Sequence, residues 1–269
     1  MSLIFIGAGN MAGALIGGLL ASGRQATEIR AVDPYAPTRQ RAAQRYGIAV
    51  AEQAGAFAAD DVVVLAVKPQ VMREVARGLA DKLAGNLVIS VAAGILMHDL
   101  GRWLGGHQRI IRVMPNTPSL IGQGVSGLVA GSGASEADLT TAETLLATVG
   151  QVTRLSSETQ IDAVTAISGS GPAYVFRWME AMMAAAADIG LDAQQARTLV
   201  LQTFKGAAEL ALASEDAPGT LRENVTSKGG TTAAALAVMD AEDIGGLIGR
   251  AVHAARDRSI ELGRELGGD

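Results

Sequence analysis

The chain has 269 residues, with 22 Lys and Arg against 27 Asp and Glu, and a formal net charge of −5. The absence of cysteine excludes disulfide frameworks, zinc–thiolate sites and cysteine nucleophiles, and the three scattered histidines form no metal-binding pattern. The mildly acidic balance lacks the basic surface of a nucleic-acid binder, and the apolar runs are too short or too interrupted to span a membrane. The first residues lead straight into an expected strand without a basic segment, so we expect no signal peptide and a cytoplasmic location.

The first half of the chain alternates apolar runs with helical patterns. Strands are expected over residues 3–6, 29–32, 61–67, 87–91, 109–114 and 124–130, and helices over 11–22, 39–46 and 136–148. The run at 61–67 is almost continuously apolar, as in a strand that is buried on both faces. This alternation predicts the α/β class, with a doubly wound parallel sheet and right-handed crossovers.

From about Thr159 onward the pattern is helical throughout. Residues 174–190 and 193–214 are apolar around much of the helix circumference, and such helices must be buried. A helical domain of about 110 residues is too small to bury those apolar surfaces by itself. We therefore expect burial against a partner subunit, with a self-contained bundle as the alternative. The predicted division is a dinucleotide-binding domain over 1–158 and a helical domain over 159–269, whose glycine-rich last residues we expect to fray.

A glycine-rich loop follows the first expected strand and opens the first helix. It reads Gly7-Ala8-Gly9-Asn10-Met11-Ala12, a G-x-G-x-x-A pattern. The first glycine permits a tight turn, the second lets a pyrophosphate approach the backbone, and the small third residue lets helix and strand pack closely. Free amides at the helix start then face the phosphates. The strand–loop–helix context favours a nicotinamide dinucleotide site, and a purely structural glycine turn is the alternative.

Asp33 ends the second expected strand, where a carboxylate accepts hydrogen bonds from the adenosine ribose hydroxyls. Its charge favours NADH, because it would repel the 2′-phosphate of NADPH. Arg39 and Arg41 follow closely and offer a counter-charge, although solvated helix arginines explain them equally well. Both NADH and NADPH therefore stay open as cofactors.

Two further segments lie at the carboxyl ends of expected strands, where ligands bind in open α/β sheets. One contains Ala66, Val67, Lys68 and Pro69; the other contains Met114 and Asn116. We assign both to the cofactor side: Lys68 to the ribose or phosphate, with strand capping as the alternative, and Met114 and Asn116 to the border of the nicotinamide.

A second anion site is expected near the C-terminus. Ser227, Gly229, Gly230, Thr231 and Thr232 directly precede an apolar helical run at 233–239. Amides at that helix start, together with the hydroxyls, would hold a carboxylate. Ordinary capping of the helix by threonine explains the residues of this loop equally well.

These segments, together with three others, carry a resemblance to one family. The others are Val91-Ala92-Ala93-Gly94-Ile95, Arg112-Val113-Met114-Pro115-Asn116-Thr117-Pro118 and Ile167-Ser168-Gly169-Ser170-Gly171-Pro172-Ala173-Tyr174. In this order, and over nearly the whole length, the chain resembles the pyrroline-5-carboxylate reductases. Lys228 stands where the family loop commonly has proline, so the backbone there is not fixed in φ.

The resemblance implies reduction of 1-pyrroline-5-carboxylate to L-proline by NADPH or NADH, the last step of proline biosynthesis. It implies a Rossmann-type N-terminal domain and an all-helical dimerisation domain, in homodimers that often assemble into decamers. It also places the substrate carboxylate on Ser227, Gly229, Gly230, Thr231 and Thr232, with Thr232, the candidate catalytic residue, nearest the ring nitrogen.

Two other readings compete with this one. A β-hydroxyacid dehydrogenase would need a lysine on the helix at 174–190, which contains none. A nicotinamide-sensing module would keep the glycine loop but has no need of the loop at 227–232. The motif segments also lack histidine, which fits a protonated cyclic imine better than a hydroxyl substrate that needs a general base.

Overall fold

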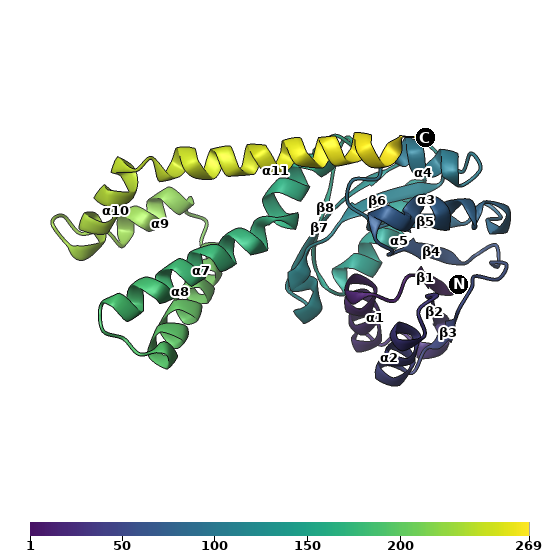
Figure 1. The fold of residues 1–269 in the computed structure, drawn as a ribbon, viewed down its shortest axis with the longest axis horizontal. Helices are drawn as coiled ribbons and strands as arrows, with labels where there is room; N and C mark the ends of the chain where they lie inside the picture. Colours follow the sequence, from purple (N-terminus) through teal and green to yellow (C-terminus); the bar gives the residue numbers. More distant parts are fainter. Residues whose placement is uncertain (269) are drawn as a thin grey trace. The chain divides into compact units, whose positions relative to one another are not determined.

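The computed structural model describes residues 1–268, and the chain divides by contacts into two compact units (Figure 1). The first unit comprises Met1–Ser170 together with the C-terminal segment from Ala254, and the second comprises Gly171–His253. The domain boundary that the sequence predicts, after residue 158, stays a prediction. The boundary by contacts lies about twelve residues later, after Ser170, and the first unit also includes the end of the last helix.

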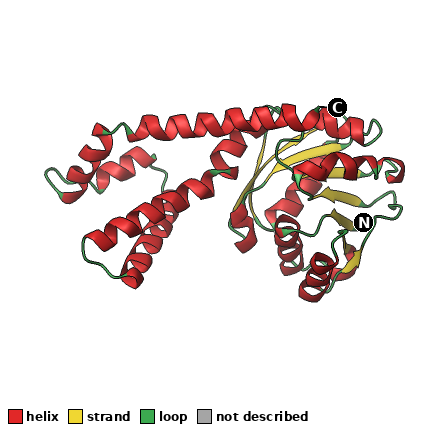
Figure 2. Ribbon diagram, in the orientation of Figure 1, coloured by secondary structure: helices red, strands yellow, loops and turns green. Residues whose placement is uncertain are grey.

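The first unit is built on one eight-stranded sheet (Figure 2). The strands are β1 (Leu3–Ile6), β2 (Ile29–Val32), β3 (Ala49–Ala51), β4 (Val62–Leu65), β5 (Leu87–Ser90), β6 (Ile110–Met114), β7 (Gly124–Ala130) and β8 (Gly150–Arg154), in the order β3-β2-β1-β4-β5-β6-β7-β8. All neighbours are parallel except β6 and β7. The predicted doubly wound α/β sheet is confirmed, with this one antiparallel pair added.

The short link between β6 and β7 explains that exception. It holds only a 3-10 turn, η3 (Thr117–Ile121), and no crossover helix. A parallel return needs a crossover of a dozen or more residues, usually a helix, so the chain turns back antiparallel here.

Helices cover both faces of the sheet. One core contains Leu15, Ile16 and Leu19 of α1 (Asn10–Ala21) with Leu145 and Leu146 of α5 (Glu136–Ala147). The other contains residues of α3 (Pro69–Arg77) and α4 (Met97–Trp103) packed on the alternate side chains of the same strands. The remaining helical elements of this unit are α2 (Ala36–Tyr46), α6 (Gln160–Val164), the turns η1 (Ala26–Glu28) and η2 (Ala80–Lys82), and the π-helical η4 (Thr165–Gly169). Both faces are thus buried, as a parallel sheet requires.

The end of α11 (Ile244–Gly267) belongs to the first unit, and the helix continues to Gly267, the first of the residues that we expect to fray. Arg102 donates to the carbonyl of Gly267 at 2.8 Å, and Arg73 donates to the carbonyl of Gly268. The two guanidinium groups satisfy carbonyls that a helix end leaves unpaired. Asp269 lies outside the described residues.

The second unit is all-helical, as predicted. It contains α7 (Gly171–Asp188), α8 (Ala193–Ala213), α9 (Pro218–Asn224), α10 (Thr231–Ala241) and the start of α11. Its buried side chains are few and small, and several large apolar ones are exposed in the single chain: Phe176, Ile189, Leu199, Leu210, Leu212 and Val238. A helix surface of this kind needs a cover.

Candidate functional site: a dinucleotide cradle and a hydroxyl-rich loop

The glycine loop has the backbone geometry that a bound phosphate requires. Gly7 has φ 97°, and a Cβ atom there would lie 2.7 Å from the carbonyl oxygen of Ala66. Any other residue would therefore clash with the end of β4, whichever rotamer it adopted. Gly9 faces open space, with nothing within 4 Å of a Cβ atom at that position. The loop thus packs tightly on the sheet side and is accessible on the ligand side.

The start of α1 is suited to an anion. Gly9 caps the helix without a side-chain hydrogen bond, and its first turn, which begins with Asn10 and Met11, holds no acidic residue. The first amides of a helix lack partners within it and carry the positive end of the helix dipole. The predicted residues Gly7 to Met11 therefore fit the pyrophosphate of a dinucleotide.

Asp33 is joined directly to this loop. Its Oδ2 atom accepts a hydrogen bond from the Ala8 amide at 3.0 Å, and its Oδ1 atom accepts one from the Tyr35 amide at 2.9 Å. The carboxylate therefore lies at the glycine loop, where a strand-end acid would meet the adenosine ribose.

Arg39 and Arg41 differ in what they contact. Arg39 donates to the carbonyls of Asp33 and Pro34, each at 2.8 Å, and pairs with Glu52 at 3.1 Å. Its guanidinium is thus occupied in holding the turn after β2. Arg41 instead lines a pocket of about 400 Å³ next to the glycine loop, bordered by Gly9, Asn10, Arg45, Tyr46 and Leu120, among others.

The segment after β4 lies beside Gly7, as its contact with Ala66 shows. Val67 is half-buried, Lys68 is exposed and precedes α3, and Pro69 is the first residue of that helix. The structure therefore brings Ala66, and the segment it begins, to the same sheet edge as Gly7 and Asp33.

Met114 and Asn116 follow β6 and are tied to the segment before α7. The Met114 methyl group would lie 2.5 Å from a Cβ atom at Gly169, so that glycine makes room for it. Asn116 is 8% exposed, donates to the Ser168 carbonyl at 3.2 Å and accepts from the Val125 amide at 2.9 Å. Both ends of the Asn116 amide are therefore used to hold neighbouring backbone.

The hydroxyl-rich loop belongs to the second unit. Gly229 has φ 73°, and the Gly230 amide donates to the Ser227 carbonyl at 3.0 Å. Gly230 caps α10 without a side-chain hydrogen bond, and the first helical hydrogen bond runs from Ala234 back to Gly230. The amides of Thr231, Thr232 and the next residue consequently have no partner within the helix. This arrangement differs from threonine capping, because neither threonine is the cap residue.

The sequence patterns passed over Tyr35 and the pocket residues Arg45, Tyr46 and Leu120. Among residues 1–268, no group of three His, Asp or Glu side chains could hold a metal ion. Within the same range, no helix is long and apolar enough to cross a membrane.

Two family models match the chain. Residues 2–94 match the model described as NADP oxidoreductase, coenzyme F420-dependent, and residues 158–262 match pyrroline-5-carboxylate reductase dimerisation. The first match supports a nicotinamide-dependent oxidoreductase, and the second supports a homo-oligomer.

Relatives of known family cover nearly the whole chain. A pyrroline-5-carboxylate reductase of Pseudomonas aeruginosa is 49% identical over 98% of each chain. A solved structure of a pyrroline-5-carboxylate reductase from Coxiella burnetii is 38% identical, with a TM-score of 0.90 over 97% of this chain and 98% of that one. The Plasmodium falciparum enzyme, solved with NADP bound, is 27% identical, with a TM-score of 0.85 over 98% of both chains. The chain therefore belongs to the pyrroline-5-carboxylate reductase family, the NAD(P)H-dependent oxidoreductases that catalyse the last step of proline biosynthesis.

Proposed function

We propose that this chain reduces 1-pyrroline-5-carboxylate to L-proline, with the dinucleotide at the glycine loop and the substrate carboxylate at residues 227–232. The observation that carries the proposal is the glycine loop. Gly7 packs on Ala66 too closely for any side chain, while the free start of α1 is left for an anion.

On the cofactor side, the backbone of Gly7, Ala8, Gly9, Asn10 and Met11 holds the pyrophosphate. Asp33 accepts hydrogen bonds from the adenosine ribose, which favours NADH. The segment Ala66, Val67, Lys68 and Pro69 borders the cofactor between its phosphates and the nicotinamide, and Met114 forms the wall beside the ring. Asn116 keeps that wall in place, given its two backbone partners. The bound cofactor supplies the hydride.

On the substrate side, the loop recognises a small carboxylate. The free amides at the start of α10 and the hydroxyls of Ser227 and Thr231 bind the carboxylate, and the positive φ of Gly229 and the close fit of Gly230 against Ser227 shape the turn. Thr232 is half-buried at the second position of the helix, and its hydroxyl holds the ring nitrogen.

The main task of the protein in this reaction is to align the hydride of the cofactor with the imine carbon of the substrate. A protonated cyclic imine is already an electrophile, so hydride addition to its carbon yields the neutral amine without a general base. Positioning of two reactants can supply about 7–11 kcal/mol of barrier reduction. The proposed site residues include one lysine and one aspartate and no histidine, which suits such a reaction.

Assembly and location complete the proposal. The dinucleotide-binding domain spans 1–158 and the helical domain 159–269, and two helical domains join in a homodimer that can build a decamer. The match to a dimerisation model and the exposed apolar side chains of α7, α8 and α10 support this. We place the enzyme in the cytoplasm, where NAD(P)H and amino-acid precursors are available.

An assay of NADH and NADPH oxidation tests the proposal. We expect turnover with 1-pyrroline-5-carboxylate and none with 3-hydroxyisobutyrate, the substrate that a β-hydroxyacid dehydrogenase would take. Thr232→Val removes only the hydroxyl and should lower kcat/KM at least tenfold with the cofactor Kd unchanged, whereas Thr226→Val, a control outside the site, should not. Turnover of the hydroxy acid, or an unaffected Thr232→Val variant, would contradict the proposal.

A further inference from the structure

Arg112 is the largest fully buried side chain, and the proposed reaction does not use it. It is 1% exposed in the middle of β6, and Ile110, on the same face of the strand, belongs to an apolar core. Its Nη1 atom donates to Oε1 of Glu158 at 2.8 Å, while Nε and Nη2 have no hydrogen-bond partner among residues 1–268. An apolar pair of similar volume would serve stability as well, so this ion pair indicates a demand on geometry.

Glu158 ties β6 to two other segments. The same Oε1 atom accepts from the Met97 amide at 2.7 Å, at the first residue of α4. The Glu158 carbonyl accepts from the Ile161 amide at 3.0 Å, in the first turn of α6. One residue therefore sets the start of α6 relative to β6 and to the loop between β5 and α4.

The segment that continues from α6 contacts the end of the same strand. It forms the π-helical η4, whose Ser168 carbonyl accepts from Asn116 at 3.2 Å. Gly169, the last residue of η4, lies against the Met114 methyl group. The two segments thus meet at both ends, through the ion pair at the start and through the wall beside the nicotinamide at the finish. π-Helical turns are rare and occur frequently at functional sites.

We propose that Arg112 is a positioning residue for hydride transfer and acts through Glu158. The ion pair sets the register of α6 and η4 along β6, and this register sets where Met114 and Asn116 stand beside the nicotinamide. The inference rests on the proposed cofactor site and deepens it. Arg112 needs no contact with the reacting atoms, because a displacement of about 1 Å can lower a rate a hundredfold.

Two variants break the ion pair from its two sides. Arg112→Met keeps an unbranched side chain and removes the charge, and Glu158→Ala removes the acceptor at a side chain that is 25% exposed. We expect each to lower kcat with 1-pyrroline-5-carboxylate about tenfold or more, with the Kd for NADH, measured by its fluorescence, within about threefold of wild type. Arg112→Lys should recover most of kcat, because Arg112 uses a single nitrogen atom to reach Glu158.

The matched control is Arg109→Met, which breaks the nearby ion pair with Asp138. It should lower the urea midpoint and leave kcat at the wild-type value. Hydrogen exchange of the cofactor-free protein gives a readout besides activity. The Ser170 amide donates to the Thr165 carbonyl at 2.8 Å across η4. Its exchange should become about tenfold faster in Arg112→Met and Glu158→Ala, because η4 loses its anchor, and should stay at the wild-type rate in Arg109→Met.

Two results would overturn the inference. One is an unchanged kcat in Arg112→Met, and the other is an equal loss of kcat in Arg109→Met, because both pairs would then act through stability alone. If Arg112→Met does not fold, Glu158→Ala decides between the same outcomes. Either contrary result leaves the proposed reaction standing when wild-type protein converts 1-pyrroline-5-carboxylate. Absence of that turnover in wild type refutes the proposed function, and the exchange of the Ser170 amide then decides whether the ion pair holds η4.

Discussion

Asp33 shows how one side chain serves structure and specificity together. Its two oxygens accept hydrogen bonds from two backbone amides, of Ala8 and Tyr35, so the carboxylate joins the glycine loop to the turn after β2. Because Arg39 is occupied with backbone carbonyls and Glu52, it does not neutralise a 2′-phosphate without giving up those contacts. This is the basis of the proposed preference for NADH.

Replacing Asp33 by asparagine should shift the cofactor preference. Asparagine keeps one acceptor oxygen at nearly the same place and removes the charge, so repulsion of the 2′-phosphate falls. We expect the ratio of kcat/KM for NADPH to that for NADH to rise by about tenfold, equivalent to about 1.4 kcal/mol. An unchanged ratio would show that this carboxylate does not face the ribose.

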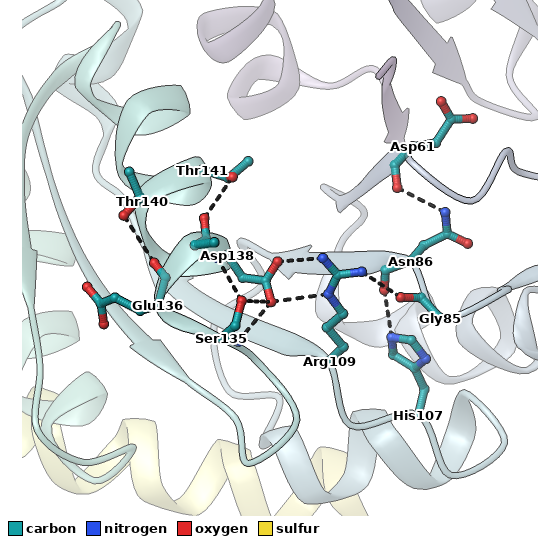
Figure 3. Close-up of polar contacts among 11 residues, drawn as sticks. Asp61, Gly85, Asn86, His107, Arg109, Ser135, Glu136, Asp138, Thr140 and Thr141 are labelled. Atoms are coloured by element: carbon teal, nitrogen blue, oxygen red, sulfur yellow. Dashed lines mark hydrogen bonds and ion pairs between the residues drawn. The ribbon is translucent and has the colours of Figure 1, made fainter.

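The ion pair between Arg109 and Asp138 contributes to stability and lies outside the candidate site. Figure 3 shows Arg109 between Asp138 and the backbone of Gly85, with hydrogen bonds to Asp138 of 3.1 and 2.7 Å. The Arg109 guanidinium, helped by Ser135, lowers the pKa of Asp138 from 3.8 to about 2. The Asp138 side chain is only 5% exposed, so its charge depends on this partner.

The lowered pKa gives a pH dependence with a definite sign. A depressed folded-state pKa contributes stability above pH 4 that is lost as the pH falls toward 2. Asp138→Asn should therefore lower the free energy of unfolding at pH 7 by about 1–2 kcal/mol, allowing for solvent around Arg109. Urea unfolding at pH 7 and at pH 2.5 measures this, and the gap to wild type should shrink at the lower pH. The control Asp60→Asn, an exposed partner of the N-terminus, should leave the urea midpoint at that of wild type. A pH-independent gap for Asp138→Asn would contradict the argument.

At the scale of elements, the hydrophobic pattern predicts the six inner strands of the sheet and misses the two edge strands. The strands β1, β4 and β5 are apolar runs buried along their whole length, and the sequence predicts all three. By contrast, β3 and β8 lie at the two sheet edges with exposed or half-buried residues, so no apolar run marks them. Their pairing is decided by the neighbouring strand, which a local pattern cannot reveal.

The sequence predicts helical structure near the C-terminus but does not mark the bounds of α11, for a related reason. Gly245, Gly246 and Gly249 interrupt its start and weaken the helical pattern, and its end packs on a distant loop. At Gly94 a Cβ atom would lie 3.3 Å from the Leu262 Cβ and 3.4 Å from the Leu266 Cδ1. This long-range packing is a tertiary contact that local propensity does not encode.

The contribution of that packing to the free energy of unfolding can be measured by substituting two glycines. Gly94 and Gly47 have φ of 69° and 65°, but Gly47 faces open space. Gly47→Ala should cost about 1 kcal/mol from backbone strain alone, and Gly94→Ala should cost about 1–2 kcal/mol more, because α11 must shift. Urea midpoints compare the two variants. Equal losses would mean that the end of α11 does not press on this loop.

For the whole molecule, the second unit is incomplete as a single chain. Large apolar side chains such as Leu212, 87% exposed, and Phe176, 63% exposed, remain on its helices. The sequence predicts both the helices and the need for a partner, because their apolar faces are too wide for so thin a domain. The glycine loop belongs to the first unit and the hydroxyl-rich loop to the second.

A charge placed on this surface should separate the subunits. Phe176→Glu would bury a carboxylate in the proposed dimer interface, so we expect sedimentation velocity to shift from dimers or larger assemblies toward monomers at micromolar concentration. The control is Leu120→Glu, a residue 55% exposed in the first unit, which should sediment as wild type does. An unchanged Phe176→Glu profile would place the interface elsewhere.

The most direct test of the proposed reaction follows the hydrogen itself. The enzyme is given 1-pyrroline-5-carboxylate and NADH that carries deuterium at nicotinamide C4, and the product is identified by mass spectrometry and NMR. We predict L-proline with one deuterium on the former imine carbon, from one of the two C4 diastereomers of labelled NADH and not from the other. Oxidation of NADH without labelled proline, or deuterium at any other ring carbon, would contradict hydride transfer to the imine.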